Sequence, residues 1–80
     1  MNTKEKINNL ELSRITVDNI EDRSDYELVT ILGGFNGSSM WNVYLEQIKE
    51  IMNLFKDCWL IDLTNDCLDD LWKLRIGIRK

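Results

Sequence analysis

Apolar residues recur at spacings of three and four along the middle of the chain, which is the pattern of an amphipathic helix. The predicted helix covers residues 40–58, and a serine just before it can cap its first turn. Its apolar stripe consists of Trp41, Tyr44, Ile48, Ile51, Phe55 and Cys58, widened by Leu45, Met52 and Trp59. Asn36-Gly37 is also a hairpin signal, so a strand over residues 38–45 is kept as an alternative.

Two segments before the helix have the pattern of strands. Residues 26–32 are apolar on both parities, as in a central strand. Residues 10–17 alternate in two pieces with a break near Ser13-Arg14, which predicts a strand with a bulge. We expect these strands to pair antiparallel through a charged turn at residues 18–25, and we expect residues 1–9 to be frayed.

The C-terminal third has two competing patterns. Residues 59–63 form a short apolar link that fits a brief strand, and a second helix is predicted from Thr64 or Asn65, carrying Leu68, Leu71 and Trp72. Its early aspartates and its late lysine and arginine suit the helix dipole. Residues 73–80 also alternate strictly, so a final strand is the alternative. Together these elements predict a small α+β domain over residues 1–80: a two- to three-stranded antiparallel sheet with two helices packed on one face.

Charge and composition narrow the function. The chain has 80 residues and a net charge of −4, from 14 acids and 10 bases. That balance argues against a sequence-independent nucleic-acid binder, which needs a basic surface. Histidine is absent from the sequence, which removes the usual general base at neutral pH and the commonest metal ligand. We therefore expect no enzyme activity, no cofactor and no metal site.

The sequence has no apolar run near the ~20 residues of a membrane helix and no signal-peptide pattern. Its two cysteines, Cys58 and Cys67, are too few for a disulfide framework and do not form a C-x-x-C pair. We expect both to be reduced and the protein to be cytoplasmic.

The segment Gly33-Gly34-Phe35-Asn36-Gly37-Ser38-Ser39 lies between a strand and a helix, and we interpret it as a tight turn followed by a helix cap. A second pattern overlaps it. Ser24-x-x-Glu27-Leu28-x-x-Ile31-x-Gly33-Gly34 resembles the double-glycine leader of small secreted bacterial peptides such as class II bacteriocins. The resemblance covers residues 24–34 and implies a precursor that is cleaved after Gly34.

Two further features indicate a protein partner. Residues 57–72 contain no lysine or arginine, and their carboxylates can steer a basic partner. Three apolar residues of the predicted helix lie off its main stripe, and this excess apolar surface should meet a second helix, a homodimer mate or another protein. The predicted partner-binding residues are Asp57, Asp62, Asp66, Asp69, Asp70, Met40, Val43 and Leu54.

The function favoured by the sequence is stoichiometric protein binding without catalysis. A small, acidic, cytoplasmic domain of this kind suits an inhibitor, immunity or anti-defence protein of bacterial or phage origin. Its partner would have a basic surface, as a nuclease or another nucleic-acid-acting enzyme has, and we expect no direct contact with nucleic acid or membrane. The alternatives are the secreted peptide precursor and a structural or dimerisation subunit. A homodimer is compatible with the binding protein and with the subunit.

Overall fold

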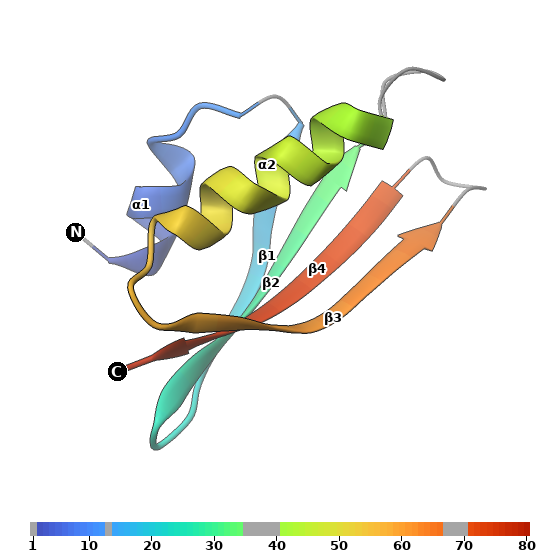
Figure 1. Ribbon diagram of the computed structural model, residues 1–80. Helices are drawn as coiled ribbons and strands as arrows, with labels where there is room; N and C mark the ends of the chain where they lie inside the picture. The colour runs from blue at the N-terminus through green and yellow to red at the C-terminus, as the bar shows by residue number, and fades with distance from the viewer. Residues whose placement is uncertain (1, 13, 35–40, 67–70) are drawn as a thin grey trace.

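The chain forms six elements in a computed structural model that describes residues 2–12, 14–34, 41–66 and 71–80 (Figure 1). The side chains of residues 41–44 and 66 lie outside that description. The elements are α1 (Thr3–Asn8), β1 (Ile15–Asp22), β2 (Tyr26–Gly34), α2 (Trp41–Asn53), β3 (Cys58–Asp66) and β4 (Leu71–Arg79).

The described strands form one sheet of four, in the order β1-β2-β4-β3, and each neighbouring pair is antiparallel. β2 and β4 are therefore central, and β1 and β3 are the edges. The α+β class and the antiparallel pairing of the first two strands are confirmed. The predicted two or three strands are too few, because the C-terminal third supplies both β3 and β4.

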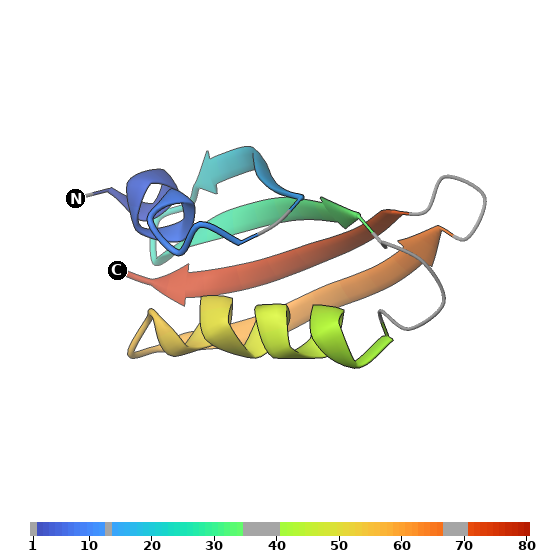
Figure 2. The ribbon, with the colours of Figure 1, turned by 90° about the horizontal axis from the view of Figure 1, so that it is seen from above.

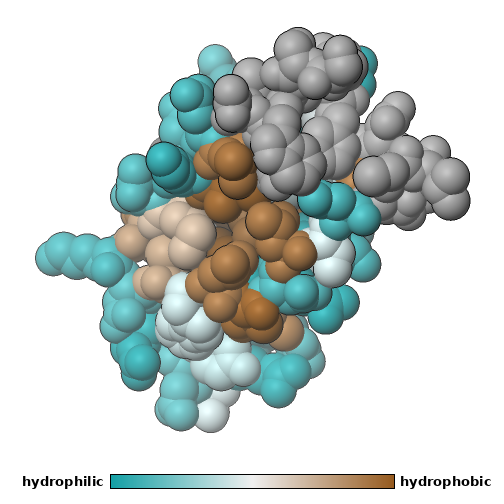
Figure 3. Space-filling view, turned by 45° about the vertical axis from the view of Figure 1, so that its right-hand side comes forward, coloured by the Kyte–Doolittle hydropathy of each residue, from teal (hydrophilic) through white to brown (hydrophobic). Residues whose placement is uncertain are grey.

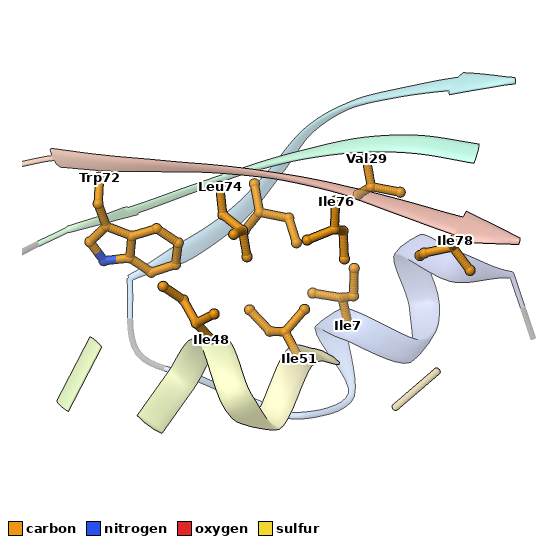
Figure 4. Close-up of a cluster of buried hydrophobic side chains, with 9 residues drawn as sticks. Ile7, Val29, Ile48, Ile51, Trp72, Leu74, Ile76 and Ile78 are labelled. Atoms are coloured by element: carbon orange, nitrogen blue, oxygen red, sulfur yellow. The ribbon is translucent and has the colours of Figure 1, made fainter. Parts of the chain in front are cut away.

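Both helices pack on the same face of the sheet. Figure 2 shows α1 on the β1–β2 side and α2 on the β4–β3 side. The apolar core lies between this helix layer and the sheet, and Figure 4 shows side chains from the two layers pointing toward each other. The buried core residues are Ile7, Val29, Ile31, Ile48, Ile51, Trp72, Leu74, Ile76 and Ile78.

One of the two helices arises where a frayed end was expected. The side-chain oxygen of Asn2 accepts a hydrogen bond from the Glu5 N–H at 2.8 Å, which caps the first turn of α1. Ile7 is buried in the core, and the Thr3 hydroxyl donates to a Glu27 carboxylate oxygen at 2.6 Å. These contacts hold a six-residue helix that would not be stable alone.

The second helix predicted in the C-terminal third is wrong. Thr64 and Asn65 lie in β3, Leu71 and Trp72 lie in β4, and Leu68 lies outside the described residues. Alternate β4 residues enter the core, namely Trp72, Leu74, Ile76 and Ile78. β4 pairs with a strand on each side and buries this face under the helices. That burial outweighs a favourable placement of charges along a helix, which contributes at most about 1 kcal/mol per exposed charge. The alternative of a final strand is confirmed.

α2 is a helix from Trp41, so the strand alternative for residues 38–45 is wrong over 41–45; residues 38–40 lie outside the described part. α2 ends at Asn53, earlier than predicted. The N–H of Leu54 donates to the carbonyl of Ile51 at 3.2 Å, which tightens the chain at this end. No helix in the described ranges is long and apolar enough to cross a membrane.

β1 is displaced along the chain from its predicted position. Glu11 and Arg14 have left-handed backbone angles, with φ of 54° and 61°, so the chain turns before the strand starts at Ile15. Leu10 and Leu12, expected to lie in the strand, pack against the core from this connection. The strand continues to Asp22 with a bulge between Val17 and Asn19, which leaves a shorter charged turn than predicted.

Candidate functional site

One face of the sheet is covered by neither helix (Figure 2). We call it the open face, and the register assigns its residues, because residues directly opposite each other on antiparallel strands share a face. On the central strands it carries Tyr26, Leu28, Thr30 and Leu32 of β2, and Leu71, Lys73, Arg75, Gly77 and Arg79 of β4. On β3 it carries Trp59, Asp62 and Thr64.

An aromatic cluster lies at one end of the open face. Trp59 is opposite Gly77, and a Cβ atom at Gly77 would overlap the indole ring. The rings of Tyr26 and Trp59 are 5.3 Å apart between centroids and inclined at 57°. The guanidinium carbon of Arg79 lies 5.6 Å from the Trp59 ring, within the range of a cation–π contact. Trp59 was expected both at the edge of the helix stripe and in a brief strand over residues 59–63, and the structure confirms the strand.

Two of the predicted carboxylates lie beside arginines of β4. An Asp57 carboxylate oxygen is 2.8 Å from Nε of Arg79, and both side chains are more than half exposed. The Arg79 N–H also donates to the Asp57 carbonyl at 2.9 Å. Asp62 lies on β3 directly opposite Arg75. The acidic run is therefore partly compensated by cations from further along the chain, which pairing of the strands brings alongside.

Of the other predicted binding residues, Leu54 alone has a side chain that the structure describes. Asp66 ends β3 and Val43 lies in α2, but their side chains are not described. Leu54 follows α2, is partly buried and packs against the core. The remaining predicted residues, Asp69, Asp70 and Met40, lie outside the described residues.

Exposed apolar side chains occur instead along β3 and the neighbouring helix. Leu60 is 51% exposed, Ile61 is 44% exposed and Leu45 of α2 is 40% exposed. Figure 3 shows apolar side chains gathered on one face of the molecule. Leu45 was expected in the buried stripe of the helix, and Leu60 and Ile61 in a brief strand. Their exposure was not predicted, because only the strand order makes β3 an edge.

Cys58, at the start of β3, points away from the open face. Its thiol donates to the carbonyl oxygen of Met52 at 3.2 Å. Burial raises the pKa of the Cys58 thiol, and the charge of Asp57 raises it further. The thiol is thus protonated at neutral pH and has the character of a structural group. Within the described ranges no cluster of three or more His, Cys, Asp or Glu side chains could hold a metal ion.

The two glycines of the leader-like pattern are the last residues of β2. Gly33 lies opposite Trp72 and Gly34 opposite Leu71, so both are paired with β4. A Cβ atom at Gly33 would overlap the buried Trp72 indole, which gives this glycine a role in packing. Cleavage after Gly34 would cut the chain between β2, with core residues Val29 and Ile31, and β4, one of the two strands that β2 pairs with.

Comparison of the chain with protein-family models, with curated proteins and with solved structures finds no match.

Proposed function

We propose that this protein binds another protein stoichiometrically and without catalysis, in the manner of an inhibitor, immunity or anti-defence protein. β3 supplies the centre of the contact. The observation that carries the proposal is the exposure of two consecutive apolar residues of an edge strand, Leu60 at 51% and Ile61 at 44%. An apolar pair at a sheet edge costs solubility unless a partner covers it.

The composition of the open face supports the same assignment. Trp59, Tyr26 and Arg79 are of the three residue types most enriched among interface residues that contribute large binding energies. They lie in contact at one end of the open face, next to the first residues of β3. A partner that covers the β3 edge could reach this cluster without rearranging the sheet.

Charge supports a basic partner. The net charge of −4 attracts a cationic surface over distances set by the ionic strength. Asp57 and Asp62 are exposed, although each has an arginine of β4 as a neighbour. We expect complex formation to slow with added salt, since charges at the rim of an interface act mainly on the association rate.

Photo-crosslinking in the native host tests the proposal. p-Benzoylphenylalanine replaces Ile61 in one full-length variant and Asp18, the bulged residue of the opposite edge strand, in a second. We expect a single one-to-one adduct with a different protein from position 61 and none from position 18. An adduct of two copies would indicate a dimerisation subunit instead. A product cleaved after Gly34 would indicate the peptide precursor, and either result would overturn the proposal.

A further inference from the structure

The two edges of the sheet are built alike but are protected differently. Each edge strand has a bulge near its middle, at Asp18 in β1 and at Ile61 in β3. Bulges and charged side chains both discourage an edge from pairing with another chain. β1 has both devices, because Asp18, at the bulge itself, is exposed and is followed by exposed Glu21 and Asp22. β3 has an exposed acid, Asp62, directly after its bulge, but an exposed isoleucine stands at the bulged position itself.

We infer that β3 receives a short extended segment of the partner as an added strand. This inference rests on the proposed function, and it specifies how the partner is held. In strand addition, main-chain hydrogen bonds supply affinity and alternate side chains supply specificity. The bulge at Ile61 interrupts the outer edge, so a long regular strand cannot pair along all of β3, and this favours a short segment.

The two faces of β3 define the chemistry of the segment. Side chains of an added strand fall on the same two faces as the β3 residues opposite them. On the helix side those residues are Leu60 and Leu63, which lie opposite Ile76 and Leu74, and they select apolar side chains. On the open face they are Trp59, Asp62 and Thr64, and Asp62 selects lysine or arginine. The expected segment alternates apolar and basic residues.

Charge argues against a second copy as the occupant. Residues 57–66 contain Asp57, Asp62 and Asp66 and no lysine or arginine. Pairing of β3 with itself would bring these acids together, and like charges on neighbouring strands are destabilising. The segment of a basic partner gains the opposite interaction at the same positions.

Synthetic peptides test the inference on the isotope-labelled full-length protein. The first probe is a short peptide of alternating lysine and valine, about half the length of β3. The second replaces lysine by glutamate, and the third is the lysine peptide with every amide N-methylated, which keeps the side chains but removes the donors. We expect the first peptide to slow hydrogen exchange in residues 58–66 and not in residues 15–22. The other two should bind at least about tenfold more weakly, a loss of about 1.4 kcal/mol.

Two charge-reversal variants locate the contact. Asp62→Lys should weaken binding of the lysine peptide about tenfold and improve binding of the glutamate peptide. Asp18→Lys makes the same change in net charge at the β1 bulge and should leave the affinity within a factor of about two. Equal effects of the two variants would show that the peptide responds only to overall charge and would overturn the inference.

Three other results would also overturn the inference. They are no binding at millimolar lysine peptide, equal protection of β1 and β3, or protection of β3 that grows with protein concentration alone, which would indicate a second copy.

The inference and the proposed function fail separately. A one-to-one crosslink from position 61 without exchange protection of β3 in the complex would leave the function standing and replace strand addition by side-chain docking. Peptide binding without any crosslinked partner would leave strand addition at β3 standing and remove the support for the proposed function.

Discussion

The indole of Trp59 lies against the backbone of Gly77, its direct partner across β3 and β4, on the face of the sheet that neither helix covers. We expect Gly77→Ala to lower the free energy of unfolding by about 1 kcal/mol, because the new methyl group must displace the ring. Urea unfolding measures the change. In a Trp59→Ala background the same substitution should cost little, since the ring is gone; an equal cost in both backgrounds would contradict this contact.

Gly33 makes the equivalent contact with Trp72 on the buried side of the sheet. Trp72 is fully buried, so its ring cannot move aside into solvent. Gly33→Ala should therefore destabilise more than Gly77→Ala, by about 3 kcal/mol, when both are measured by urea unfolding. The reverse order would mean that the helix layer yields more easily than the open face.

The ion pair between Asp57 and Arg79 should contribute little to stability. Both side chains are more than half exposed, and exposed pairs are typically worth less than about 1 kcal/mol. We expect Asp57→Asn to shift the free energy of unfolding by less than that amount. Arg79→Lys keeps the charge and changes the geometry, so it is the matched control. A loss of several kcal/mol in Asp57→Asn alone would show that the pair is structurally essential.

α1 should be an integral part of the fold. Ile7 enters the core beside Ile51, and truncating a buried isoleucine costs about 2–5 kcal/mol. We expect Ile7→Ala to fall in that range by thermal or urea unfolding. Lys4→Ala, on the exposed side of the same helix, should change stability by less than about 0.5 kcal/mol. Equal stability of the two variants would indicate that α1 is not docked.

The raised pKa of the Cys58 thiol predicts a loss of stability in alkali. The folded state holds the proton more tightly than the unfolded state does, because burial and Asp57 disfavour the thiolate. The stability that comes from the protonated thiol is fully present at pH values below the pKa of the thiol in the unfolded state. It is lost as the pH rises through the pKa of the thiol in the folded state. Comparison of the protein with Cys58→Ala between about pH 7 and pH 10 isolates it. A stability difference between the two that does not change with pH would contradict the shift.

Helices and strands could be predicted from the sequence where their buried apolar residues follow one another or recur at a short, regular spacing. The stripe that includes Ile48 and Ile51 predicted α2, and the continuous apolar run around Val29 and Ile31 predicted a central strand. The helix expected from Thr64 failed because apolar residues such as Leu71 and Trp72 fit a helix stripe and a strand about equally well over so short a run. Only the pairing of strands decides between the two.

The candidate site was harder to predict from the sequence, because it depends on which strands are neighbours in the sheet. Asp62 appeared uncompensated because its opposite residue, Arg75, lies beyond the acidic run in sequence. Leu60 and Ile61 resembled core residues, as apolar residues in a strand usually are. Their exposure follows from the position of β3 at the edge of the sheet, and no local pattern records that position.

The strand order also has a consequence for synthesis on the ribosome. β4 is the last of the six described elements, yet it lies between β2 and β3 and pairs with both. Until β4 has been synthesised, the described part of the chain lacks the strand that joins the hairpin of β1 and β2 to β3. The four-stranded sheet can therefore be completed only after translation of β4, whichever of its two neighbours this strand pairs with first.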